Sequence, residues 1–361
     1  MNKARSKFPV VRQYIYANTA AFGLYSDDLL DWRQEHDLDF LLHGSGMRSK
    51  GLKIIEDTRD SVASMFHCKR DSVALVPNFS LGINMVLNSL KEGAKVALLE
   101  NDYPSVNWPF ETRSFKTFQI SITTQLEDDI KNLIAKENID VLALSLVQWL
   151  NGIKVDLDFL KQLKIDNPGL LIIADGTQFC GTTNFNFQES GIDILGASAY
   201  KWLLSGYGNG FLLFKEGVKK ELSIPVIGFS SANADEEKKE KIPFVKHFEP
   251  GHLSSSVFGS LNFSMYFMKD IGMDKIEDQI KCLANKAKLE FSNLGLLEDA
   301  VIQRKEHSSI FNIKGNEDLY KHLTENDVIC SQRGDGIRLS FHFYNTEKDI
   351  DDIVKIIKSA S

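Results

Sequence analysis

Short runs of consecutive apolar residues recur through the middle of the chain, and stretches with helical spacing of apolar positions separate them. Apolar residues on successive positions are typical of strands covered on both faces, as in parallel sheets. The pattern predicts six such strands: Ser72–Val76, Lys95–Leu99, Val141–Leu146, Leu170–Ala174, Ile192–Ala197 and Gly210–Phe214. Helices are predicted between several of them, at Ser80–Leu90, Gln125–Lys136 and Asp156–Ile165. This alternation predicts a doubly wound α/β domain.

From about Gly259 the pattern changes to that of an α+β unit. A long amphipathic stretch runs from Ser260 towards Leu294 and is interrupted at Gly272. Shorter predicted elements follow it: a β-like segment at Ser309–Ile313, a helix near Leu319–Leu323, a strand pair at Asp327–Ser331 and Gly336–His342, and a helix at Glu347–Lys358. We therefore predict a large domain over residues 18–258 and a small α+β domain formed by residues 1–17 and 259–361. The charge-dense stretch Ala234–Ile242 is interpreted as a solvated loop or helix face, with a partner-binding site as the alternative.

Composition and charge exclude several classes of protein. The 361 residues, 43% of them hydrophobic, are enough for a sizeable core, and the net charge of −7 predicts no surface for nucleic acid or anionic lipid. The four cysteines form no Cys-x-x-Cys pair, which favours reduced thiols. We find no signal-peptide pattern and no run near the roughly 18–20 apolar residues of a membrane span. We therefore expect a soluble cytoplasmic protein without membrane or nucleic-acid partners.

Two of the predicted strands deliver an acid and a lysine to the edge where ligands bind in open α/β sheets. Asp175 ends the run Leu171–Asp175, and Lys201 follows the next strand 26 residues later. Such a pair can be a plain ion pair. It can also hold pyridoxal phosphate, with the lysine as its Schiff base and the carboxylate facing the pyridinium nitrogen. Spacing alone leaves both hypotheses open.

Several ordered motifs resemble the class V aminotransferase superfamily, over nearly the whole chain. They are Asp175-Gly-Thr-Gln178, Ser198-Ala-Tyr-Lys201 with its continuation to Gly210, the N-terminal segment Asn18–Gly23, and Arg333-Gly-Asp-Gly-Ile-Arg338-Leu-Ser with Tyr344-Asn-Thr346. The resemblance implies a fold-type I transferase that depends on pyridoxal phosphate, with a large, doubly wound, mostly parallel mixed sheet domain and a smaller α+β domain. It also implies a homodimer with active sites near the interface.

The resemblance implies roles for the residues around the cofactor. Lys201 would form the Schiff base and Asp175 would pair with the pyridinium nitrogen. Gln178 would hydrogen-bond the ring's phenolic oxygen, and Ser198 would donate to the phosphate. Asn78-Phe79-Ser80 stands where relatives have a phosphate-binding turn before a helix: Phe79 can offer its backbone and Ser80 also a hydroxyl. An ordinary N-cap is the alternative for Ser80.

Four further residues are candidates for the cofactor or the substrate. Tyr103 stands where relatives stack a histidine on the ring, with a half-buried strand-end tyrosine as the alternative. Arg338 lies in the Arg-x-Ser motif that binds the substrate carboxylate, with a surface arginine as the alternative. Gln148 is predicted either to contact cofactor or substrate or to serve loop structure. His252 matches, with a departure from the usual threonine, the segment that reaches the partner subunit's cofactor phosphate. The role of Arg333 is left open.

Other chemistries fit the sequence less well. Gly206-x-Gly208-x-Gly210 precedes a strand instead of opening a helix, so we predict a tight turn and no dinucleotide loop. The histidines are mostly isolated, and no metal site is predicted. Relatives that desulfurate cysteine use a mobile loop with a catalytic cysteine near the two closing arginines. Here four residues without a cysteine separate Arg333 from Arg338, and Cys330 is predicted to be a packed thiol.

The predicted function is that of a pyridoxal phosphate enzyme acting on a small amino acid or amine. We expect transfer of the substrate amine onto the cofactor held by Lys201, proton abstraction by the freed Lys201, and a quinonoid stabilised by Asp175. An aminotransferase is the first hypothesis and a lyase or epimerase of the isopenicillin N epimerase or selenocysteine lyase type the second. An inactive relative that acts as a binding or scaffold protein is the third. The motifs do not identify the substrate side chain or the amino acceptor.

Overall fold

A computed structural model describes residues 1–360, and its centre is a seven-stranded mixed sheet in the order β2-β8-β7-β6-β5-β3-β4. Its strands are β2 (Val73–Val76), β3 (Lys95–Leu99), β4 (Lys116–Ile120), β5 (Val141–Ser145), β6 (Leu171–Asp175), β7 (Ile194–Ser198) and β8 (Gly210–Phe214). Strand β8 pairs antiparallel with both β2 and β7, and the remaining pairs are parallel. The predicted doubly wound, mostly parallel sheet is confirmed, and all six predicted strands are present.

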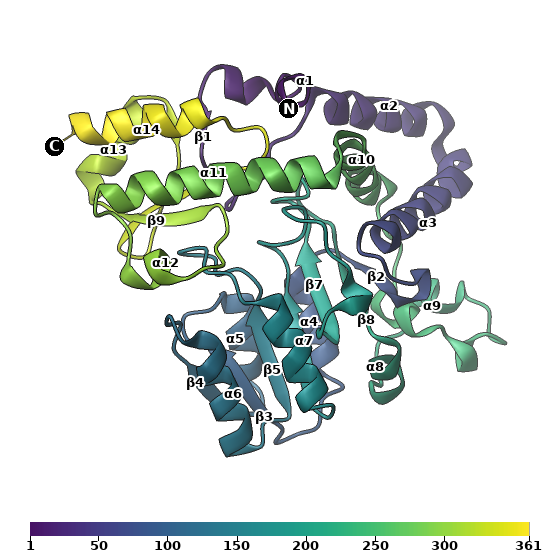
Figure 1. Ribbon diagram of the computed structural model, residues 1–361. Helices are drawn as coiled ribbons and strands as arrows, with labels where there is room; N and C mark the ends of the chain where they lie inside the picture. The colour runs from purple at the N-terminus through teal and green to yellow at the C-terminus, as the bar shows by residue number, and fades with distance from the viewer. Residues whose placement is uncertain (361) are drawn as a thin grey trace.

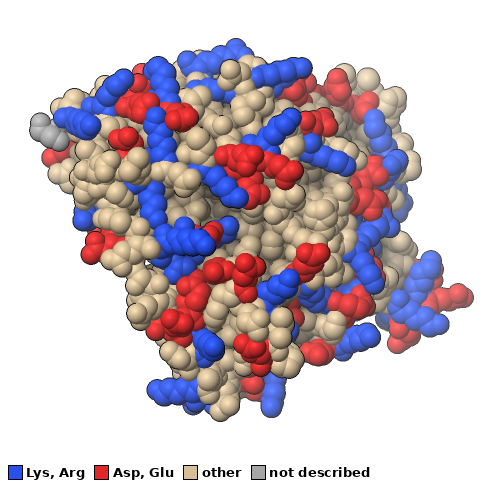
Figure 2. Space-filling view, viewed as in Figure 1, with Lys and Arg blue, Asp and Glu red and all other residues tan. Residues whose placement is uncertain are grey.

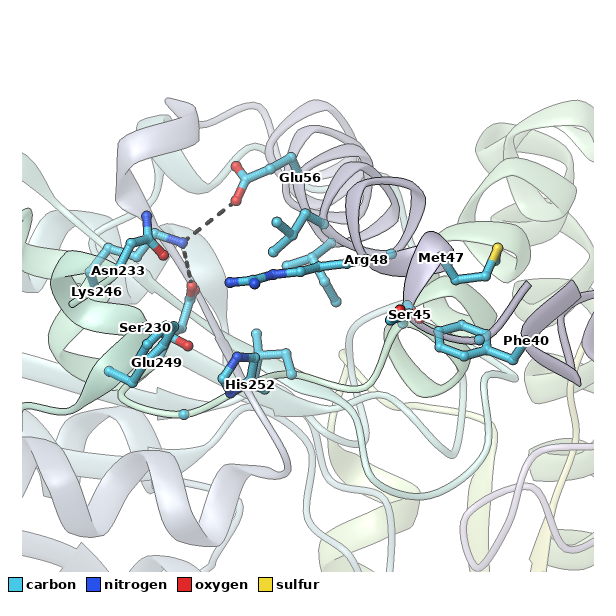
Figure 3. A pocket seen from close by; sticks show the side chains of 18 residues that line it. Phe40, Ser45, Met47, Arg48, Glu56, Ser230, Asn233, Lys246, Glu249 and His252 are labelled. Carbon is cyan, nitrogen blue, oxygen red and sulfur yellow. Dashed lines mark hydrogen bonds and ion pairs between the residues drawn. The ribbon is translucent and has the colours of Figure 1, made fainter. Parts of the chain in front are cut away.

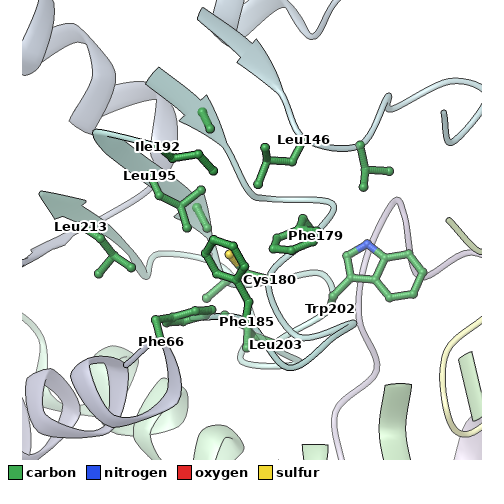
Figure 4. Packing of buried hydrophobic residues seen from close by; sticks show 14 of the residues in the cluster. Phe66, Leu146, Phe179, Cys180, Phe185, Ile192, Leu195, Trp202, Leu203 and Leu213 are labelled. Atoms are coloured by element: carbon green, nitrogen blue, oxygen red, sulfur yellow. The ribbon is translucent and has the colours of Figure 1, made fainter. Parts of the chain in front are cut away.

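Helices cover the two faces of this sheet (Figure 1). Those between its strands are α4 (Phe79–Leu87), α5 (Pro104–Glu111), α6 (Leu126–Glu137) and α7 (Leu157–Asp166). Strands β5, β7 and β8 are buried at every position, which explains their unbroken apolar sequence. On one face of the sheet the core includes Phe66, Phe179, Phe185 and Trp202, which join strand residues to the loop after Lys201 (Figure 4).

Strand β4 and helix α2 (Asp27–His43) were not predicted. In β4 one of five positions is buried, so it lacks the continuous apolar run of its neighbours. Helix α2 begins at Ser26, whose hydroxyl accepts the N–H of Leu29, but it leaves Leu38, Leu41 and Leu42 exposed. An apolar stripe facing a core is the pattern that reveals a helix in a sequence, and α2 does not have one. It is followed by α3 (Arg48–Met65), and both helices pack against α10 (Ser255–Ile271).

The last hundred residues form a second layer beside the sheet (Figure 1). Strands β11 (Ser331–Arg333), β12 (Gly336–Ser340) and β9 (Ile310–Lys314) make an antiparallel sheet. It is flanked by α11 (Met273–Asn293), α12 (Asp299–Gln303), α13 (Glu317–Glu325) and α14 (Glu347–Ser359). Strand β10 (Val328–Ile329) pairs with β1 (Ile15–Tyr16), so the start of the chain lies with its end. The predicted domain limits at residues 18 and 258 stay a prediction.

The remaining elements are short and lie near the surface. They are the helices α1 (Asn2–Arg5), α8 (Glu216–Glu221) and α9 (Phe229–Ala232), and six 3-10 turns: Pro9–Arg12, Gly44–Met47, Arg70–Ser72, Phe187–Glu189, Lys239–Lys241 and Phe244–Phe248. The charge-dense stretch contains local ion pairs such as Lys238–Asp235. On the face shown in Figure 2, Lys and Arg side chains are interspersed with Asp and Glu. No helix in residues 1–360 is long and apolar enough to cross a bilayer.

Candidate active site

The candidate site lies where the parallel strands of the large sheet end. Asp175 is the last residue of β6 and Ser198 the last of β7, and Lys201 follows three residues later. Because β6 and β7 are parallel neighbours, these side chains meet at one edge of the sheet. Asp175 and Lys201 share a small cavity, whose lining residues are Tyr103, Ser145, Val147, Trp149, Asp175, Thr177, Gln178 and Lys201. The acid and the lysine that the sequence singled out therefore lie on one cavity, and their roles stay a prediction.

Lys201 and Asp175 interact through their charges without touching. The Lys201 side chain is 4% exposed, and its Nζ lies 5.3 Å from the ring centroid of Tyr103 and 5.4 Å from that of Tyr200. Burial lowers the pKa of Lys201, the charge of Arg338 lowers it further, and Asp175 opposes both. Burial raises the pKa of Asp175. Within residues 1–360 Lys201 forms no ion pair, so the plain ion pair considered above is not formed.

Hydrogen bonds with neighbouring backbone hold the Asp175 carboxylate and the chain segment around Lys201. Asp175 Oδ1 accepts the N–H of Thr177 at 2.8 Å, and the Thr177 hydroxyl accepts the N–H of Ser198 at 3.0 Å. Through these two hydrogen bonds, Thr177 connects the end of β6 with the end of β7. From the N-terminal segment, the N–H of Gly23 donates to the Tyr200 carbonyl at 2.9 Å. A Cβ on Gly23 would overlap the carbonyl oxygen of Lys201, which explains why the segment needs glycine there.

Gln178 lies in the cavity but is already engaged. Its Nε2 donates to the carbonyl of Ala20 at 3.0 Å, and its Oε1 accepts the indole N–H of Trp202 at 2.7 Å. An amide nitrogen has two N–H groups, so one donor remains for a ligand. The predicted contact between Gln178 and the cofactor ring stays a prediction, and the structure adds Trp202 as the residue that orients the amide.

Three serine hydroxyls gather at the start of α4. Ser198 Oγ accepts the N–H of Phe79 at 2.9 Å, and the hydroxyls of Ser80 and Ser105 are 2.7 Å apart. The helix is capped by Asn78, whose Oδ1 accepts the N–H of Leu81. The ordinary N-cap suggested as the alternative for Ser80 is therefore wrong, because Asn78 fills that position. Hydroxyls and a helix N-terminus together suit a phosphate group.

Arg338, on β12, is a buried guanidinium without a carboxylate partner in residues 1–360. Its side chain is 3% exposed, so the alternative of a surface arginine is wrong. Its Nη1 donates to the carbonyl of Trp149 at 2.7 Å, whereas Nε has no hydrogen-bond partner. Burial and the charge of Arg333 lower the pKa of Arg338 to about 10. An uncompensated buried cation of this kind favours an anionic ligand.

Tyr103 and Gln148 lie at the strand ends β3 and β5. The half-buried ring of Tyr103 packs edge-on against Trp149, at a centroid distance of 5.8 Å, and faces the Lys201 amine. Gln148 is buried, and its backbone closes a turn with Gly152 and Ile153. Its Nε2 has no hydrogen-bond partner. The backbone therefore serves the loop, and a ligand contact of the side chain stays a prediction.

His252 does not line the cavity around Lys201. It lies in a separate surface cavity of about 340 Å³ with Arg48, Glu56 and Glu249, and its ring stacks on Phe229 (Figure 3). Its proposed contact with a partner subunit's cofactor stays a prediction. Arg333 is exposed at the β11–β12 turn and acts on Lys201 and Arg338 through its charge.

The arrangement fits pyridoxal phosphate. The buried donors Nε of Arg338 and Nε2 of Gln148 lack partners, and a small cavity lies between Lys201, Asp175 and the ring of Tyr103. Lys201, Asp175, Gln178 and Tyr103 would hold the ring, and the serines at α4 the phosphate. Among residues 1–360 no group of three or more His, Cys, Asp or Glu side chains could hold a metal ion.

Sequence reasoning did not assign roles to Asp102, Ser145, Thr177 and Trp149. Thr177 had a local signal, because it lies two residues after Asp175, where an aspartate side chain commonly accepts a backbone N–H. Trp149 acts through its carbonyl oxygen, which no sequence pattern reveals. Asp102 is the third buried ionisable group at this edge of the sheet, with Asp175 and Lys201, and it forms no ion pair within residues 1–360.

Comparisons with known proteins show the family of the chain. The family model for aminotransferase class-V matches residues 43–353. An uncharacterized aminotransferase, YcbU, from Bacillus subtilis (strain 168) is 24% identical over 96% of this chain and 94% of its own. The structure of a cysteine desulfurase from Thermococcus onnurineus NA1 superimposes with a TM-score of 0.87 at 19% identity, over 99% of this chain and 97% of that one. A lysine-to-alanine mutant of C-DES with glycine covalently linked to its PLP cofactor gives 0.86 at 16% identity, over 98% of each chain. The chain belongs to the class V aminotransferase family of pyridoxal phosphate-dependent enzymes.

Proposed function

We propose that the protein is an aminotransferase that acts on a small amino acid, with Lys201 as the cofactor-bearing residue and Arg338 as the anchor of the substrate carboxylate. The observation that carries this proposal is the buried Arg338 guanidinium, which lacks a carboxylate partner in residues 1–360 and acts electrostatically on Lys201. A planar guanidinium binds a carboxylate with two parallel hydrogen bonds. An α-amino acid held there would place its amine toward the lysine.

Lys201 has the properties of a proton carrier. Burial and the charge of Arg338 lower its pKa, so a neutral amine is available at a pH where an exposed lysine is charged. Pyridoxal phosphate supplies an electron sink for the bonds at the substrate Cα. Lys201 Nζ would take the Cα proton, and Asp175 would fix the ring nitrogen in its protonated form. Tyr103 and Trp149 would keep water from the reacting atoms.

The β11–β12 turn argues against cysteine desulfuration. Arg333 pairs directly with Gly336 across this turn, which leaves no loop to carry a nucleophile. Cys330 is packed in the core of the small sheet, and burial raises the pKa of its thiol to about 12. A thiol of that kind is neither reachable nor ionised near neutral pH.

A single-turnover screen of amino acids against the protein loaded with pyridoxal phosphate tests the proposal. Transamination converts the bound cofactor to its amine form and releases one keto acid per site. Keto acid and ammonia with unchanged cofactor would instead indicate a lyase, and exchange of the Cα hydrogen without keto acid an epimerase. Lys201→Ala should abolish turnover, and Arg338→Gln should raise KM far more than Arg338→Lys. A wild-type protein that binds no pyridoxal phosphate would refute the proposal.

We further propose that the active form is a homodimer. Leu41, at 80% exposure, and Leu42, Leu52, Ile227 and Phe229 leave apolar surface near the cavity that contains His252. Exposed apolar patches of this kind mark interaction surfaces. A second copy of the chain would cover them and bring His252 towards a neighbouring site. Sedimentation equilibrium of the wild type should give twice the mass of one chain. The double variant Leu41→Asp, Leu42→Asp should give the mass of one chain.

A further inference from the structure

Asp102 is a buried carboxylate that the proposed chemistry does not use. It lies three residues after the end of β3 and is 5% exposed. Its Oδ1 accepts the N–H of Tyr103 at 2.6 Å, and its Oδ2 accepts the N–H of Ser145 at 2.8 Å. Both oxygens therefore accept hydrogen bonds, which favours the ionised form. Within residues 1–360 no lysine, arginine or histidine forms an ion pair with it.

The two residues that donate to Asp102 connect it with the candidate site from two sides. Tyr103 carries the ring that faces the Lys201 amine. Ser145 ends β5 and is the direct neighbour of Asp175 in the paired strand β6. A single side chain thus spans the ends of β3 and β5, behind the edge from which Asp175 enters the cavity. Its charge reaches Asp175, because Asp102 contributes to the raised pKa of that group.

Burying a second anion so close to Asp175 is unfavourable unless a cation is present for part of the time. Asp175 and Lys201 also act on each other through their charges, and Arg338 on β12 and the exposed Arg333 act on Lys201. Burial raises the pKa of Asp102 overall, against the hydrogen bonds from Ser145 and Tyr103 that lower it. The backbone N–H groups of Tyr103 and Ser145 hold the carboxylate in place without neutralising it.

We propose that Asp102 is a positioning residue that acts as a second negative charge behind Asp175, and that it favours the protonated form of the cofactor bound at Lys201. This inference rests on the proposed function, since it requires the cofactor to lie between Tyr103, Asp175 and Lys201. Two carboxylates at one edge of the site attract a proton more strongly than Asp175 alone. Asp102 would add its negative charge from a fixed position, because it binds the backbone N–H groups of Tyr103 and Ser145.

The test is a pH titration of the absorption band of bound pyridoxal phosphate in the full-length protein. Asp102→Asn removes the charge and keeps one oxygen acceptor. The matched control is Glu100→Gln, which removes an exposed carboxylate two residues earlier that accepts a hydrogen bond from Ser121. We expect the titration midpoint of Asp102→Asn to fall by about one pH unit, because the cationic form loses a buried counter-charge. Glu100→Gln should titrate like the wild type, because solvent screens its charge.

Asp102→Ser serves as a second variant if the amide prevents folding, because its hydroxyl can accept one of the two backbone N–H groups. If the titration midpoints of both Asp102 variants equal that of Glu100→Gln, the inference is overturned. In that case the cofactor band of the wild type would still support the proposed function. A wild type without any such band would refute the proposed function and this inference with it. The readout is spectroscopic and does not require a known substrate.

Discussion

The buried ion pair between Arg59 and Glu249 should stabilise the fold far more than an exposed pair on the same helix. Arg59, on α3, binds Glu249 with both terminal nitrogens, at 2.7 and 2.8 Å, and both side chains are almost fully buried. Arg59 also donates to the carbonyl of Val73, and Glu249 accepts the N–H of Leu75. The pair therefore attaches the segment that leads to His252 to strand β2.

Removing one partner of a buried pair costs about 3–5 kcal/mol, because the other charge stays buried. For Arg59→Met we expect the low end, about 3 kcal/mol, since Lys246 remains 2.9 Å from Glu249 as a counter-charge. Glu249→Leu should cost about 3–4 kcal/mol, because Arg59 would keep only Glu56, at 3.5 Å, as an anion. The control is Lys53→Met, which breaks the exposed Lys53–Asp57 pair on α3 and should leave the urea midpoint close to that of the wild type.

Urea unfolding followed by tryptophan fluorescence measures these values, with one saturating concentration of pyridoxal phosphate in every sample so that ligand binding contributes equally. The double variant Arg59→Met with Glu249→Leu should lose less than the sum of the single variants, by about 2–3 kcal/mol. An Arg59→Met variant within about 1 kcal/mol of wild type, or additive single effects, would show that the pair is not coupled.

Three further predictions concern Glu249, Gly23 and the start of helix α14. Burial opposes ionisation of Glu249, but Arg59 and Lys246 lower its pKa overall; its stabilisation is complete above the unfolded glutamate pKa of about 4.3 and is lost as the pH falls through the folded value. Acid unfolding of the Arg59→Met, Glu249→Leu variant should therefore depend less on pH in this range, and an unchanged profile would contradict the assignment. Gly23→Ala should weaken pyridoxal phosphate binding at least tenfold in a fluorescence titration, since its Cβ would displace the Lys201 carbonyl; unchanged affinity would be the opposing result. Thr346→Ala should lower the free energy of unfolding by about 1 kcal/mol, because it removes the capping box of α14, and a urea midpoint equal to wild type would argue against that role.

Pattern and motif identified much of the large domain because its signals are local. A strand such as β5, buried at every position, must be apolar throughout, and the residue that ends it must lie at the ligand-binding edge. The helices α2 and α5 lacked comparable signals. The apolar residues of α2 are exposed, and α5 is short and contains Pro109. Helix α5 packs Val106 and Phe110 in the core, but it is too short to show a helical period in the sequence.

The sequence by itself determined the strand ends that carry Asp175 and Lys201, since apolar runs and motif spacing depend on residues close together in the chain. Only the tertiary structure decided what surrounds them. It showed that Arg338, more than 130 residues beyond Lys201, is buried without a counter-ion, and that Asp102 lies behind Asp175. Burial and the absence of a partner depend on contacts between segments far apart in sequence, and these contacts set the charge balance of the site.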